Sequence, residues 1–123
     1  MRQVILDTET TGLEWDQGHR IIEIGCIEFL SRRVTKNRFH RFINPERSID
    51  RGALEVHGIT AESLLDTPRF SDIVDELLEF ITGSELVIHN ADFDIGFLNN
   101  ELSLTGRNFG RIEDVCTIQD TLQ

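Results

Sequence analysis

Asp7 and Glu9 are the residues whose type and spacing most clearly predict chemistry in this sequence. They follow three apolar residues at positions 4–6, which predict a buried strand that a Thr-Thr-Gly turn at 10–12 ends. Because side chains alternate in direction along a strand, the two carboxylates are expected on one face, where they repel each other. A cation would relieve that repulsion, and carboxylates at a strand's end can bridge Mg²⁺ or Mn²⁺ in phosphoryl-transfer sites. The alternative is that Asp7 caps a turn and Glu9 is solvated.

A second group of acids repeats this arrangement later in the chain. Residues 85–88 predict another short buried strand, and Asp92 and Asp94 fall in the first turn of the helix expected after it. Acids at that position favour the helix dipole without any further role, and we expect Asp92 to be solvated. If the two strands are neighbours, Asp94 reaches the same sheet edge as the first pair. The crowding of three carboxylates should then raise at least one pKa above its unfolded value.

Composition and charge limit the classes of function. No apolar run approaches the ~20 residues of a membrane span, and no signal-peptide pattern opens the chain, which predicts a cytoplasmic protein of one domain. The net charge of −10 argues against binding along a broad surface of duplex phosphates. If the substrate is nucleic acid, local contact with the end of a strand is favoured. The basic residues between positions 32 and 41 are expected to form a solvated hairpin. Cys26 and Cys116 are expected to be free, buried thiols.

The hydrophobic pattern predicts a mixture of strands and helices. Strands beyond the first are expected at residues 21–29, 39–43, 85–88 and 112–116. Helices are expected at residues 50–56, 60–65, 68–82 and 92–105, and from Thr117 onward. Thr67 as N-cap and Pro68 at the first helical position should begin the third of these helices. We therefore expect a three-layer α/β fold whose mixed sheet has the first strand at its centre and the last two strands parallel to it.

Four segments together resemble a known family. They are the Asp-x-Glu-Thr-Thr-Gly start, the Ile-Ile-Glu-Ile-Gly strand, the Val-His-Gly-Ile turn and the His-Asn-Ala-x-Phe-Asp segment. In order and spacing they are similar to the DEDD 3′→5′ exonucleases, especially the proofreading (epsilon) subunits of bacterial DNA polymerase III. The resemblance implies a ribonuclease H-like fold, two divalent cations (Mg²⁺ or Mn²⁺) and release of nucleoside 5′-monophosphates from 3′ ends. It also implies two partners, a single-stranded or melted DNA 3′ end and a polymerase III alpha-type subunit.

The resemblance further implies roles for individual residues. The residues that match the first three metal-binding acids of the family are Asp7, Glu9 and Asp94. Those that match the segment meeting the terminal nucleotide are Thr10, Thr11 and Gly12. Those that match positions lining the pocket for its base and sugar are Leu13, His57 and Phe93. A lone His before Gly is often only a turn residue, so His57 has a second explanation.

One part of the family pattern is missing. The family needs a fourth acid on a late helix, with a His four or five residues before it that acts as general base for the attacking water. Asp114 and Asp120 have no such His, because no His occurs after His89. The resemblance therefore implies that residues 1–123 are an incomplete exonuclease domain without its late helices, and that this chain is nearly inactive.

Two other functions fit parts of the sequence. A non-catalytic, nuclease-like scaffold that binds polymerase or nucleotide would explain the missing His and acid. A haloacid-dehalogenase-type phosphatase also places an Asp-x-Asp-x-Thr motif after a hydrophobic strand, but here the second acid is Glu and the later strand–helix alternation is absent. Within the exonuclease interpretation, RNA substrates stay open, because nothing in the sequence tests for a 2′-hydroxyl.

Overall fold

The computed structural model describes residues 1–121. Its strands are β1 (Arg2–Thr10), β2 (Ile21–Leu30), β3 (Arg33–Phe42), β4 (Glu85–Ile88) and β5 (Thr117–Asp120). Its α-helices are α1 (Arg51–His57), α2 (Phe70–Ile81) and α3 (Ala91–Leu104). Short 3₁₀ turns lie at η1 (Trp15–Gln17), η2 (Glu62–Leu64) and η3 (Ile112–Asp114). None of the helices within this range is long and apolar enough to cross a membrane.

The strands form one mixed sheet in the order β3-β2-β1-β4-β5. β1 pairs antiparallel with β2 and parallel with β4, and β5 continues the parallel half. This confirms the prediction that the first strand is central and that the last two run parallel to it. Within β1, only residues 3–5 pair with β4. The second half of β1 therefore extends past β4, toward the start of α3, the helix that follows β4.

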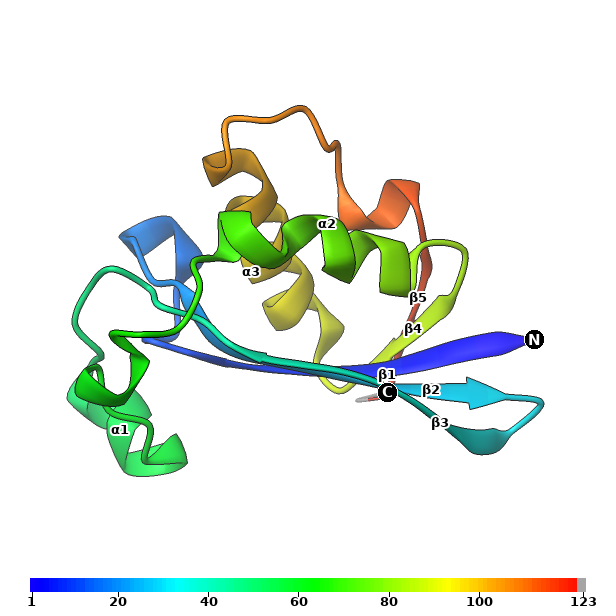
Figure 1. The fold of residues 1–123 in the computed structure, drawn as a ribbon, viewed down its shortest axis with the longest axis horizontal. Coiled ribbons are helices and arrows are strands. Elements are labelled where there is room, and N and C mark those ends of the chain that lie inside the picture. Colours follow the sequence, from blue (N-terminus) through cyan, green and yellow to red (C-terminus); the bar gives the residue numbers. More distant parts are fainter. Residues whose placement is uncertain (122–123) are drawn as a thin grey trace.

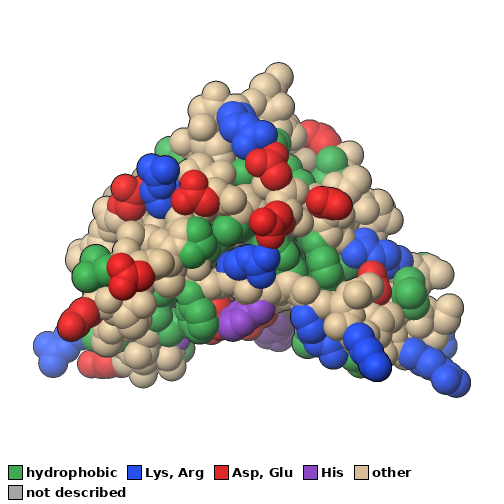
Figure 2. All heavy atoms as spheres, viewed as in Figure 1, with side chains coloured by type: hydrophobic (Ala, Val, Ile, Leu, Met, Phe, Trp, Pro, Cys, Tyr) green, Lys and Arg blue, Asp and Glu red, His purple; other side chains and the backbone are tan. Residues whose placement is uncertain are grey.

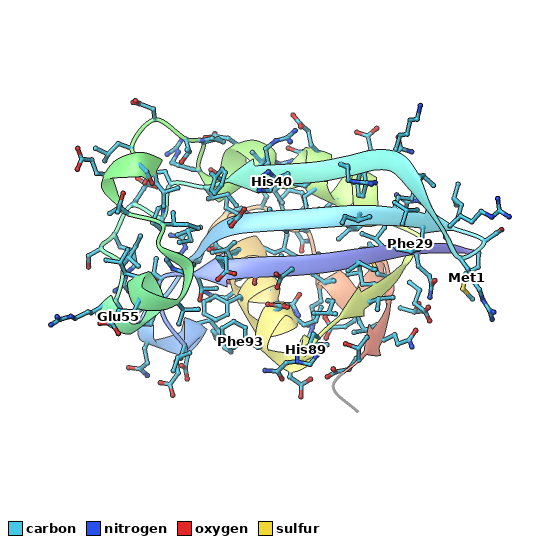
Figure 3. The ribbon with its side chains drawn as sticks, turned by 90° about the horizontal axis from the view of Figure 1, so that it is seen from below. Met1, Phe29, His40, Glu55, His89 and Phe93 are labelled. Carbon is cyan, nitrogen blue, oxygen red and sulfur yellow. The ribbon has the colours of Figure 1, made fainter. Side chains whose placement is uncertain are left out.

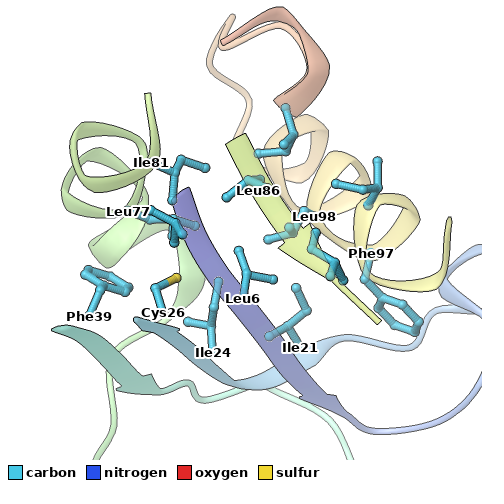
Figure 4. Close-up of a cluster of buried hydrophobic side chains, with 14 of the residues drawn as sticks. Leu6, Ile21, Ile24, Cys26, Phe39, Leu77, Ile81, Leu86, Phe97 and Leu98 are labelled. Carbon is cyan, nitrogen blue, oxygen red and sulfur yellow. The ribbon is translucent and has the colours of Figure 1, made fainter. Parts of the chain in front are cut away.

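Helices α2 and α3 cover one face of the sheet, as Figure 1 shows. Their apolar side chains meet those of β1, β2 and β4 in a closed core, part of which Figure 4 shows. Among the described residues, no helix covers most of the opposite face (Figure 3). Ile5 of β1, whose side chain alternates with the buried Val4 and Leu6, is 40% exposed. Residues 1–121 thus supply two of the three expected layers, the sheet and the helices on one side of it.

The α2 helix follows the predicted pattern but begins later. The helical spacing is confirmed by its buried residues, which are Phe70, Ile73, Val74, Leu77 and Ile81. The backbone of Arg69 is extended, and its N–H donates to the Asp72 carboxylate at 3.0 Å, which caps the helix at this point rather than at Thr67. The helix expected at 60–65 is reduced to η2. Cys26 and Cys116 are buried and free, as predicted.

The hairpin of β2 and β3 has a tighter turn than expected. Only Ser31 and Arg32, both with positive φ, form the turn, and β3 starts at Arg33 instead of after residue 37. The early part of β3 is polar, but Thr35 and Asn37 donate hydrogen bonds to the Glu28 carboxylate on β2, which holds this part in the sheet. Lys and Arg side chains gather over the end of the hairpin, at the lower right of Figure 2, as predicted for a solvated cluster.

The C-terminal part departs most from the sequence-based prediction. Residues 112–116 were expected to form a strand, but they contain the 3₁₀ turn η3, in which the Asp114 carboxylate accepts the Arg111 N–H at 2.9 Å. The strand lies instead at Thr117–Asp120, where a helix was expected, because β4 offers a parallel edge for pairing. Positions 122 and 123 of that expected helix lie outside the described residues.

Candidate active site

The alternation of β1 places Asp7 and Glu9 together on the open face of the sheet, as predicted. The β1 residues that face the helices are buried, namely Val4, Leu6, Thr8 and Thr10. Across on β2, Asp7 lies opposite Gly25 and Glu9 lies opposite Glu23. Burial and the neighbouring Asp7 carboxylate raise the pKa of Glu9, and Glu23 adds to the effect. The pair therefore carries the mutual repulsion that its spacing predicts.

The first turn of α3 brings Asp94 to the same end of β1. Asn90, in a left-handed conformation with φ of 60°, turns the chain from β4 into the helix. Asp94 is only 4% exposed and accepts a 2.6 Å hydrogen bond from the Thr8 hydroxyl. Burial raises the pKa of Asp94 to about 6, and the negative charges of Asp7 and Glu9 add to the rise. The expected upward shift of a carboxylate pKa is confirmed at Asp94 and at Glu9.

The chemistry of these carboxylates fits a divalent cation. Carboxylate oxygens are the ligands that Mg²⁺ and Mn²⁺ prefer. Burial is the main cause of the raised pKa values of Glu9 and Asp94, and the neighbouring negative charges, which a cation would neutralise, add to the rise. The carboxylates do not form a closed cage: within residues 1–121, no three His, Cys, Asp or Glu side chains converge closely enough to hold a metal ion. A cation would therefore have to draw them inward. Asp92 is exposed, as expected for a solvated acid.

A pocket of about 460 Å³ opens beside Glu9, between the end of β1 and α1. The predicted substrate-binding residues that line it are Thr10, Gly12, Leu13, His57 and Phe93. The other lining residues are Thr8, Glu9, Asp50, Gly52, Ala53 and Val56. Leu13 is 81% exposed and Val56 is 83% exposed, so the rim is apolar. The pocket has the size of a small-molecule site, and the acids that line it are Glu9 and Asp50.

His57 links the two walls of this pocket. Its Nδ1 accepts the backbone N–H of Ile59 at 2.9 Å, and its Nε2 lies 3.1 Å from the backbone oxygen of Thr10. Since Nδ1 is the acceptor, Nε2 carries the proton and donates to Thr10. His57 therefore joins the end of α1 to the end of β1, and it is more than a residue of its own turn.

Thr11 is placed differently from the other predicted substrate-binding residues. It is fully buried, its hydroxyl accepts the Arg20 N–H at 3.0 Å, and the same oxygen lies 2.9 Å from Nδ1 of His19. The His19 ring occupies the space beside Gly12, where an added Cβ would come within 2.4 Å of it. Thr11 thus holds the turn whose neighbours, including Gly12, line the pocket.

Sequence reasoning missed the ion pair of Arg20 and Glu101. The Arg20 guanidinium donates to the Glu101 carboxylate at 2.7 to 3.1 Å, and the backbone N–H of Ile21 donates to it at 2.9 Å. The pair fixes the start of β2, next to the Thr11 turn, on α3. A signal was present, because Glu101 follows Phe97 and Leu98 at core-facing helical spacing.

Comparison with known proteins finds relatives over nearly the whole chain. The family model described as exonuclease, of the RNase T type, matches residues 4–122. The DNA polymerase III epsilon subunits of Salmonella typhimurium and Escherichia coli are 50% and 48% identical over 98% of this chain. The corresponding subunit of Rickettsia conorii is 52% identical over 99% of it. The chain spans 51% to 53% of these relatives, about half their length.

Solved structures show the same fold. Exonuclease X, in complex with 5′ overhanging duplex DNA, is 30% identical, with a TM-score of 0.65 over 77% of this chain and 52% of that one. Product-bound exonuclease I reaches a TM-score of 0.81 over 97% of this chain and 29% of that one, at 15% identity. The second likeness concerns the fold alone, which is the ribonuclease H-like fold expected from the sequence.

Proposed function

This chain belongs to the RNase T exonuclease family, and from that premise we propose that it is part of a 3′→5′ exonuclease acting on DNA. The observation that carries the proposal is the group of Asp7, Glu9 and Asp94 around the end of β1, together with the pocket beside Glu9, whose size suits a terminal nucleotide. The similarity to polymerase III epsilon subunits supports proofreading beside a polymerase alpha-type subunit as its setting. The acidity of the chain agrees with delivery of a melted 3′ end by such a partner.

Each group of residues has a part in this proposal. Asp7, Glu9 and Asp94 would hold the divalent cations, Mg²⁺ or Mn²⁺, which when bound supply charge neutralisation at the phosphate and activation of water. Leu13 and Phe93 offer apolar surface to the base and sugar and exclude water from them. The Thr8 hydroxyl holds Asp94 in place through its 2.6 Å hydrogen bond.

The residues that bind the end of the strand follow directly after the acids. Thr10 and Gly12 bring backbone groups to the pocket, and the buried Thr11 keeps their turn rigid. His57 orients the Thr10 carbonyl by donating a hydrogen bond to it. The general base of the family has no counterpart in the sequence after His89. We therefore propose that this chain binds a 3′-terminal nucleotide but hydrolyses it slowly.

The test compares this chain with a version extended to the length of its relatives. With Mn²⁺ and single-stranded DNA, the extended version should remove nucleotides from 3′ ends, and residues 1–123 should be about 10²- to 10⁴-fold slower for lack of the general base. Asp94→Asn should abolish cutting, whereas Asp92→Asn, which changes an exposed acid two residues away, should not. An extended protein that binds nucleotide but never cuts would instead favour the non-catalytic scaffold.

A further inference from the structure

A second hollow adjoins the nucleotide pocket. Its volume is about 350 Å³, and it is lined by Leu13, Glu14, Trp15, Asp16, Asp92 and Phe93. Leu13 and Phe93 line both hollows, so these two side chains separate them. Figure 3 shows Phe93 beside α3, on the side of the turn that contains η1. A ligand longer than one nucleotide would pass from the first hollow to the second across this apolar pair.

Trp15 is held against α3 by a close contact. A Cβ added at Gly96 would lie 2.6 Å from the indole Nε1 and 2.9 Å from Cδ1, so one edge of the ring rests on the helix where only glycine leaves room. The side chain is nevertheless 44% exposed. Phe93 is held by Phe97, with ring centroids 4.9 Å apart. The second hollow therefore has two aromatic walls whose positions are fixed by packing.

We propose that the second hollow binds the base of the penultimate nucleotide, stacked on Trp15, when the terminal nucleotide occupies the first pocket. The proposal rests on the proposed function, since it assumes a single-stranded 3′ end as ligand. Aromatic side chains stack on bases of any sequence. Glu14, Asp16 and Asp92 repel phosphate, so the neutral base enters the hollow and the sugar–phosphate backbone passes outside. Trp15 then contributes only to ligands of two or more nucleotides.

The single tryptophan of the chain is its own probe. The protein is titrated in Mg²⁺ with a nucleoside 5′-monophosphate and with a phosphorothioate-linked dinucleotide, while calorimetry reports binding of each. The dinucleotide should quench the Trp15 fluorescence, and the monophosphate should bind with little change. A dinucleotide that binds without quenching would overturn the proposal. Quenching by a lysine-rich peptide but not by the dinucleotide would assign the hollow to a protein partner and overturn it as well.

Variants separate stacking from a merely structural role. Trp15→Leu should weaken dinucleotide binding about five- to a hundredfold, the usual effect of losing one stacked base, and leave monophosphate binding unchanged. Trp15→Phe should retain most of the affinity, and Leu65→Ala, at another exposed apolar residue, should retain all of it. Equal weakening of both ligands by Trp15→Leu would overturn the proposal. If the parent binds neither ligand, the proposed function fails; if Trp15→Leu binds the dinucleotide like the parent, only the present proposal fails.

Discussion

Helix α3 buries two carboxylates, two turns apart, in opposite electrostatic surroundings. Glu101 is 1% exposed and is matched by the Arg20 guanidinium and the Ile21 N–H. Asp94 is 4% exposed, and beyond the hydroxyl of Thr8 its charged neighbours include two further acids. The pKa of Asp94 rises to about 6, mainly because of burial. The two carboxylates are thus similarly buried on one helix, but Glu101 has a cationic partner and Asp94 has acidic neighbours.

The difference separates structural acids from functional ones. A buried carboxylate with a cationic partner and N–H donors is part of the scaffold, and its loss leaves the partner uncompensated. A buried carboxylate held beside other carboxylates costs stability, and such sites are where ligand binding is expected. On this criterion Glu101 positions the start of β2, and Asp94 belongs to the proposed cation site.

Removing the structural acid should have the largest effect. Glu101→Ala leaves Arg20 partly buried without its partner, so we expect the free energy of unfolding to fall by about 3–5 kcal/mol in urea titrations. Asp75→Ala is the matched control, because it breaks the Arg107–Asp75 pair, which is bidentate but exposed, with side chains 52% and 64% accessible. The control should lose much less stability. Equal losses would show that burial of the Arg20–Glu101 pair does not increase its contribution to the free energy of unfolding.

Replacement of Asp94, the acid proposed to bind a cation, should have the opposite effect on stability. Asp94 binds its proton up to about pH 6 in the folded protein, against 3.8 when unperturbed, so the folded state holds more protons between these values. Its contribution to stability is fully present below pH 3.8 and declines as the pH rises through about 6. In EDTA, Asp94→Asn should therefore be more stable than the parent at pH 8, by on the order of 2–3 kcal/mol.

The measurement is urea unfolding of parent and variant at pH 5 and pH 8. The advantage of Asp94→Asn should shrink at the lower pH, where the parent carboxyl is itself largely protonated. Asp92→Asn, at an exposed acid in the same helical turn, should follow the parent at both values. A parent and an Asp94→Asn variant with the same pH dependence would contradict the assignment of the raised pKa to Asp94.

These acids also differ in how far they could be predicted from the sequence. Asp7 and Glu9 were predictable because the period of a strand fixes their common face without tertiary information. Asp94 followed from one topological step, the pairing of β4 with β1. The Arg20–Glu101 pair joins residues 81 positions apart, and no local rule names its partner.

The C-terminal errors have a related cause. Residues 117–120 have a weak local pattern, in which half-buried and exposed positions alternate. They form a strand because their backbone pairs in parallel with β4. For Asp120, the sequence suggests only a comparison with the fourth acid of the family pattern. In the structure its carboxylate accepts the backbone N–H groups of Asn90 and Ala91, each at 3.1 Å, and so fixes the turn that leads to Asp94. Non-local roles of this kind leave no periodic signal in the sequence.

The smallest expected effect is stabilisation of the folded protein by a divalent cation. A ligand that binds only the folded state stabilises it by RT ln(1 + [L]/Kd), about 1.4 kcal/mol at ten times the Kd. Mn²⁺ should therefore raise the melting temperature of the parent at pH 8, where Asp94 is ionised and repulsion among the acids is greatest. Asp7→Asn and Asp94→Asn should each remove most of this gain, because each takes one donor and one negative charge from the proposed site. Asp75→Ala, which alters a carboxylate already satisfied by Arg107, should keep the full gain. If Mn²⁺ stabilised all four proteins equally, the cation would be binding elsewhere on this acidic chain. Asp7 and Asp94 would then not belong to a shared cation site.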